Sequence, residues 1–103
     1  MPTVEEFFDH LGIDYADDKI RRNATRALKD AQSYLRSAVG ADIFELLPGD
    51  DKATRLVLEY ASDFYDERGT SAKAGNARRE MIDSMEWQLR MELARVREGG
   101  GVA

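Results

Sequence analysis

Residues 51–69, DKATRLVLEYASDFYDERG, decide the fold of this chain. On a helical wheel at about 100° per residue, the apolar side chains of this stretch spread over roughly 200° of the circumference, which is about twice what a surface helix needs. They are Ala53, Leu56, Val57, Leu58, Tyr60, Ala61, Phe64 and Tyr65. A helix that is apolar over so much of its surface must be packed on two or three sides. We therefore expect a central helix over 51–68, capped by Asp50 or Asp51 and ended by Gly69. The side chains expected to be inaccessible to solvent are Leu56, Tyr60, Ala61 and Phe64.

Two helices and a short apolar segment precede this central helix. The first, over 3–11, opens with a capping box made by Thr3 and Glu6. The second, over 18–39, carries an alanine-rich stripe at spacings of three and four, and small side chains allow a close approach to the central helix. Each of these helices is expected to end at a glycine. Residues 41–51 form a single turn at best, and their apolar side chains are expected to cover one end of the core.

The last predicted helix runs from about 76 to 97, after a small polar loop, with Asn76 as its cap. Its core stripe consists of Ile82, Met85, Leu89, Leu93 and Val96. On its surface, Glu86 and Arg90 are expected to form a favourable i, i+4 ion pair. Together these helices predict an all-α fold: a compact four-helix domain over residues 1–98 with a flexible glycine-rich tail over 99–103.

A second apolar stripe lies on the last helix, centred about 150° from the core stripe. It contains Trp87, Met91 and Ala94 at positions i, i+4 and i+7. A tryptophan with a methionine one turn further on makes a patch rather than a single exposed side chain. Either the N-terminal helix covers Trp87, using Phe7 or Phe8, or the stripe is a protein–protein contact. We favour the contact, because tryptophan is enriched at interface hot spots and methionine adapts to partners.

The charge of the chain alternates along its length around a net charge of −5. Residues 1–16 carry −4, residues 17–41 carry +3, residues 42–68 carry −5 and residues 69–103 carry +1. The net negative charge argues against a broad nucleic-acid-binding face. One interpretation is that these segments are solvated helix faces with internal salt links. The other is that Arg21, Arg22 and Arg26 face an acidic neighbouring subunit, for which the 42–68 segment is a candidate.

The sequence offers no pattern for catalysis, for a metal or for a cofactor. The chain has no cysteine and one histidine, which excludes thiolate sites and sites that need two histidines. Glu6 and His10 are expected to form a surface pair rather than half of a metal site. No glycine pattern for binding phosphate is present, and no apolar run approaches the roughly 20 residues that span a bilayer. We therefore expect a soluble, cytoplasmic protein that is not an enzyme.

Several segments occur in an order typical of one protein family. Leu11-Gly12-Ile13-Asp14 is followed by Asp17-Asp18, and the Ala31-x-x-Tyr34-Leu35 stripe ends at Gly40. The central helix closes on Tyr65-Asp66-Glu67-Arg68, and a long final helix follows. From about Val4 to Arg97 the chain resembles the small all-helical head–tail connector (adaptor) proteins of tailed bacteriophages and prophages. Residues 42–51 and the tail after Arg97 have no counterpart in this resemblance.

The resemblance implies a structural role in the virion, after assembly in the host cytoplasm. Such proteins form a ring, usually a dodecamer, below the portal protein, where the ring extends the DNA channel and gives the stopper or tail-completion protein a docking surface. DNA passes through without sequence-specific binding, and there is no catalytic residue or cofactor to carry over. Tyr65 and Arg68 match the family's Tyr-x-x-Arg. The arginine links helix ends within a subunit, which we favour, or reaches a neighbour.

Two other classes of function are compatible with a small helical chain. A transcriptional regulator would need a short turn between two helices and a basic recognition helix. Here the basic helix over 18–39 is long and striped with alanine, and no short turn precedes it. A regulatory subunit that binds one partner protein as a heterodimer is the third possibility, and subunit mass in solution distinguishes these three.

Overall fold

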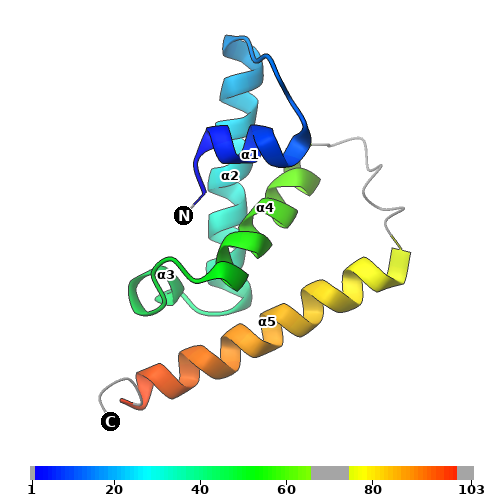
Figure 1. The fold of residues 1–103 in the computed structure, drawn as a ribbon. Coiled ribbons are helices and arrows are strands. Elements are labelled where there is room, and N and C mark those ends of the chain that lie inside the picture. The colour runs from blue at the N-terminus through cyan, green and yellow to red at the C-terminus, as the bar shows by residue number, and fades with distance from the viewer. Residues whose placement is uncertain (1, 66–74, 100–103) are drawn as a thin grey trace.

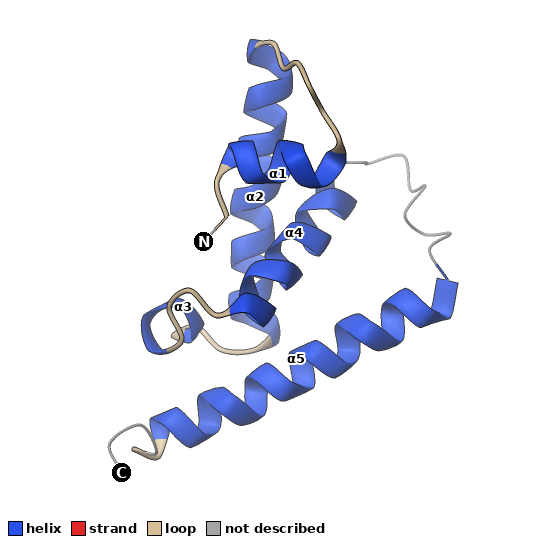
Figure 2. Cartoon of the chain, in the orientation of Figure 1, coloured by secondary structure: helices blue, strands red, loops and turns tan. Residues whose placement is uncertain are grey.

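The computed structural model describes residues 2–65 and 75–99, and within these residues the chain is all-α with no strand (Figure 2). The helices are α1 (Val4–Leu11), α2 (Asp18–Ala38), α3 (Ile43–Leu46), α4 (Asp51–Tyr65) and α5 (Gly75–Arg97). The all-α prediction is confirmed, α1, α2, α4 and α5 correspond to the four predicted helices, and α3 is the single turn expected before the central helix. The last three residues of the predicted central helix, 66–68, lie outside the described residues, and so does the Asn76 side chain.

Side-chain caps fix where the first helices begin and end. The Thr3 hydroxyl accepts a hydrogen bond from the Glu6 amide, and the Glu6 carboxylate accepts one from the Thr3 amide, which completes the predicted capping box. Gly12 closes α1 with φ 77°, a left-handed conformation that favours glycine. Asp17 caps α2 by accepting from the Ile20 amide at 2.8 Å. At α4 the cap is Asp50, whose carboxylate accepts from the amides of the second and third residues of the helix.

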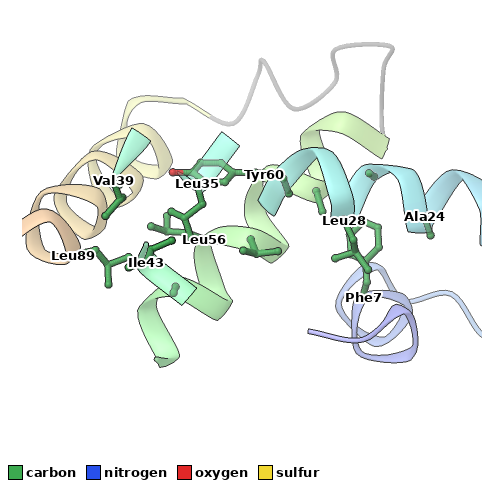
Figure 3. Packing of buried hydrophobic residues seen from close by; sticks show 14 of the residues in the cluster. Phe7, Ala24, Leu28, Leu35, Val39, Ile43, Leu56, Tyr60 and Leu89 are labelled. Atoms are coloured by element: carbon green, nitrogen blue, oxygen red, sulfur yellow. The ribbon is translucent and has the colours of Figure 1, made fainter. Parts of the chain in front are cut away.

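The core lies mainly between α2 and α4, which form the most extensive packing in the fold (Figures 1 and 3). Small side chains on α2 allow this close packing, since Ala24 and Ala31 are fully buried. On α4, Leu56 and Ala61 are fully buried and Tyr60 nearly so, as predicted. The remaining fully buried side chains are Phe7, Leu35, Ile43, Val57, Leu89 and Leu93.

The prediction that Phe64 is inaccessible is wrong, because its side chain is 40% exposed. Its ring packs edge-on against Tyr34, with the ring centroids 6.2 Å apart. Tyr34 is itself half exposed, since it lies at the solvent edge of α2. Phe64 therefore finds only a partial cover, although its position on the wheel falls within the apolar arc of α4.

Near the C-terminal end of α2, Gly40 makes room for α5. A Cβ atom at this position would lie 2.5 Å from Leu93 Cδ2 and 2.5 Å from Arg97 Nη2, which is closer than packed atoms can approach. Ile43 of α3 is fully buried beside this contact and covers the end of the core, as the sequence predicted (Figure 3). α2 ends at Ala38 with Val39 as its cap, so Gly40 follows the helix directly as predicted, and the structure gives this glycine a packing role as well.

Candidate interaction surfaces

The two apolar stripes of α5 lie in different environments. Leu89 and Leu93 are fully buried, whereas Trp87 is 59% exposed, Met91 is 53% exposed and Ala94 is exposed. Residues 87, 91 and 94 therefore face away from the body of the domain, along the long helix at the base of Figure 1. We call this surface the outward face of α5.

The N-terminal helix does not cover Trp87, so that alternative is excluded. Phe7 is fully buried and packs edge-on against Tyr65 of α4, with centroids 5.9 Å apart. Phe8 is also buried, and its ring lies under the guanidinium group of Arg21 of α2 at 5.5 Å. Both phenylalanines thus hold α1 on the α2–α4 pair, and the outward face of α5 stays open.

Polar contacts on both edges of α5 hold it against the rest of the domain. Lys52 of α4 donates to Glu92 at 2.8 Å, and this bond raises the pKa of the Lys52 ammonium group. Arg90 donates to the carbonyl oxygen of Ala38 at 2.9 Å, at the end of α2. At its C-terminal end α5 is tied to the α2–α3 connection by a two-point contact between Arg97 and Asp42, which lowers the pKa of that carboxyl group.

The predicted Glu86–Arg90 pair is not formed, because each residue binds another helix. The Glu86 carboxylate accepts a hydrogen bond from the Tyr60 hydroxyl of α4. Burial first, and this bond second, raise the pKa of Tyr60 well above its ordinary value. Arg90 binds the end of α2 as described. Contacts between helices replace the contact within one helix that the spacing predicted.

A buried carboxylate joins α1, α4 and α5. Glu59 is only 8% exposed, yet it lies in the middle of the central helix. Arg78 of α5 donates to its carboxylate at 2.9 Å and to its carbonyl oxygen at 3.1 Å, while Arg55 donates at 3.2 Å. Burial alone would raise the pKa of Glu59, but these hydrogen bonds hold it below its ordinary value. The fourth member of this Glu59 cluster is His10 of α1, whose Nε2 lies 3.7 Å from the carboxylate.

The structure corrects the predicted pairing of Glu6 with His10. Glu6 uses its carboxylate in the capping box of α1, and His10 faces Glu59 instead. Within the described residues, no group of three or more histidine, cysteine, aspartate or glutamate side chains is placed to hold a metal ion. None of the helices in the described ranges is long and apolar enough to cross a membrane.

The three arginines predicted for an interface differ in what they contact. Arg21 binds the Glu5 carboxylate at 2.9 Å and lowers its pKa, so this arginine fastens α1 to α2. Arg22 and Arg26 are exposed and make no ion pair with a carboxylate in the described residues. Lys19 and Lys29 are exposed on the same side of α2. Together with Arg22 and Arg26, these lysines recur at spacings of three, four and three. The sequence contains this pattern, but the net charge of the 17–41 segment does not reveal it.

The acidic 42–68 segment has fewer carboxylates available for a partner subunit than its sequence suggested. Asp42 binds Arg97, Asp50 caps α4, Glu59 is buried, and Asp63 accepts from Arg78 at 3.4 Å. Most of its described carboxylates are therefore engaged within the chain.

The two family-motif residues are described only in part. Tyr65 ends α4 and packs on Phe7, which is a structural role. Arg68 lies outside the described residues, so both of its predicted roles remain open.

Comparison with protein-family models, with curated proteins and with solved structures finds no match for this chain.

Proposed function

We propose that this chain is a non-enzymatic structural subunit of a phage or prophage particle, a head–tail connector that forms a ring under the portal protein. In this role the ring extends the DNA channel and provides the docking surface for the stopper or tail. The observation that carries the proposal is the outward face of α5, where Trp87 and Met91 are more than half exposed while Leu89 and Leu93 on the same helix are fully buried. An exposed patch of this composition is typical of a protein–protein contact.

Two further features support a role in assembly. The outward face runs along residues 87–94 of α5, about 10 Å at about 1.5 Å per residue, so it forms one continuous strip of about two helical turns. The order of sequence features from Val4 to Arg97 resembles the connector family, whose members act as rings between head and tail. An all-helical domain with an open face is compatible with that assembly.

The experiment is co-sedimentation of the purified chain with a portal oligomer encoded by the same genome. We expect the wild-type chain to sediment with the portal at physiological salt, and Trp87→Ala to reduce the bound fraction. Tyr15→Ala is the matched control, because Tyr15 is a 79% exposed aromatic residue outside α5. Absence of portal binding by the wild-type chain, or tight binding to duplex DNA at physiological salt, would overturn the connector role in favour of a regulator.

A further inference from the structure

Acidic side chains extend the outward face of α5 toward its N-terminal end. Glu80, Asp83, Trp87 and Met91 follow one another at spacings of three, four and four, and all four are exposed. At about 100° per residue, they lie within about 40° of the direction of Trp87, together with Ala94. No basic side chain of α5 falls within this arc. We call these four residues the acidic–apolar row.

The solvent side of α2 carries a row of the opposite charge. Lys19, Arg22, Arg26 and Lys29 follow one another at spacings of three, four and three, and all four are exposed. They lie within about 40° of one direction, which points away from the buried alanines of α2, and no acidic side chain of α2 falls within that arc. We call these four residues the basic row.

The two rows are opposite in the sign of their charge and similar in length. At about 1.5 Å per residue, the basic row extends over about 15 Å and the acidic–apolar row over about 16 Å. None of the eight side chains forms an ion pair with another described residue. The charged side chains of each row are thus free of ion pairs within the described chain, and the two rows are of similar length.

We propose that the acidic–apolar row of one chain docks on the basic row of a second copy of this chain. This inference rests on the proposed function and names the faces that meet between neighbouring subunits. The Glu80 and Asp83 carboxylates face the basic head groups of the second copy. Trp87 lies under a guanidinium group, where a cation–π contact forms, and Met91 packs on the aliphatic stems of the basic side chains.

The two rows face away from the body of the domain on different helices, so one copy cannot pair them with each other. A contact between two different surfaces is heterologous: it leaves one free row of each kind at the ends of a dimer and continues into a ring or a filament. The basic row is also the surface that nucleic acid would use. Because the acidic–apolar row supplies a partner of matching charge and an apolar centre, a second copy is the occupant that the observations favour.

A charge swap between two variants tests this contact by sedimentation velocity. In R22E/R26E two carboxylates stand at the centre of the basic row, between Lys19 and Lys29, and in E80K/D83K two ammonium groups replace the two carboxylates of the acidic–apolar row. We expect the wild-type chain to self-associate, more weakly as salt rises, because exposed charges are screened beyond about 8 Å at physiological ionic strength. Each variant alone should associate at least about tenfold more weakly, because like charges then meet. An equimolar mixture of the two variants should recover association, since each contact again joins opposite charges.

The control variant D9K/D14K changes the net charge by the same amount as E80K/D83K but at exposed positions outside both rows, and it should associate like the wild-type chain. Circular dichroism should show that all variants keep their helices. A wild-type chain that stays monomeric, a mixture that associates no better than its components, or a basic row that instead binds duplex DNA would each overturn the inference. Portal binding by the wild-type chain without recovery in the mixture would remove this contact and leave the connector role. Recovery of association in the mixture without portal binding would keep this contact and remove the connector role.

Discussion

Replacing Trp87 by alanine should weaken self-association much more than it lowers the free energy of unfolding. Replacing Leu89 on the same helix should mainly lower the free energy of unfolding. About two-fifths of the surface of Trp87 is covered, since the residue is 59% exposed. For a side chain that buries about 200 Å² when enclosed, this is about 80 Å², or about 2 kcal/mol at about 25 cal/mol per Å². Retention of Cβ, partial burial in the unfolded chain and the better helix propensity of alanine reduce this figure to about 1 kcal/mol.

Leu89→Ala should cost about 2–5 kcal/mol, because a fully buried leucine leaves a cavity. Urea unfolding followed by circular dichroism gives both free energies, and sedimentation velocity gives assembly. We expect Trp87→Ala to unfold near the wild-type midpoint but to associate about 30-fold more weakly, the effect of losing a hot spot worth about 2 kcal/mol. A Trp87→Ala protein that loses 3 kcal/mol or more of stability, and whose folded fraction assembles normally, would refute the assignment of this side chain to an interface.

Three further predictions concern the fold. Gly40→Ala should destabilise the chain by about 1–3 kcal/mol in urea, since the new methyl group overlaps the buried Leu93 side chain; a loss below about 0.5 kcal/mol would show that the Leu93 and Arg97 side chains shift at little cost and that this packing does not need glycine. Because the folded-state pKa of Glu59 lies below its ordinary value, its pairing with Arg78 stabilises the fold above about pH 4.5 and is lost as pH falls through that pKa. Glu59→Gln should therefore show a smaller loss of unfolding free energy between about pH 6 and pH 3, and an equal loss would exclude this role. Phe64→Ala should cost less than the 3–5 kcal/mol of a buried phenylalanine, and calorimetry showing the full loss would mean that this ring is enclosed.

The helices of this fold could be predicted from the sequence because their signals are local. A capping box, an aspartate cap and a stripe at spacings of three and four depend only on neighbouring residues, and Thr3, Gly12 and Asp50 act as predicted. The buried face of α4 could also be predicted from the sequence, because a broad apolar arc must be packed against other elements, whichever elements these are. Capping residues therefore account for where the first helices begin and end, and periodicity accounts for most of the core.

The errors concern contacts between helices, which periodicity does not encode. Phe64 falls within the apolar arc, but it lies beside Tyr34 at the solvent edge of α2 and stays 40% exposed. Glu86 has the correct spacing for a pair with Arg90, but the Tyr60 hydroxyl of another helix binds it instead. A distance along one helix cannot show which partner another helix brings closer.

The second stripe on α5 was visible in its periodicity, but the sequence left open whether the N-terminal helix covers it, and the structure leaves Trp87 and Met91 more than half exposed. Which side would be buried followed from the longer stripe, and Leu89 and Leu93 are indeed the enclosed pair. What the sequence did not give was the attachment of α5, which depends on Arg78 at the Glu59 carboxylate and Arg97 at Asp42. These two contacts lie near opposite ends of the helix, so they limit its rotation about its own axis as well as its tilt. A helix fixed in rotation presents Trp87 in one direction only, and a repeated contact between identical subunits requires such a fixed direction.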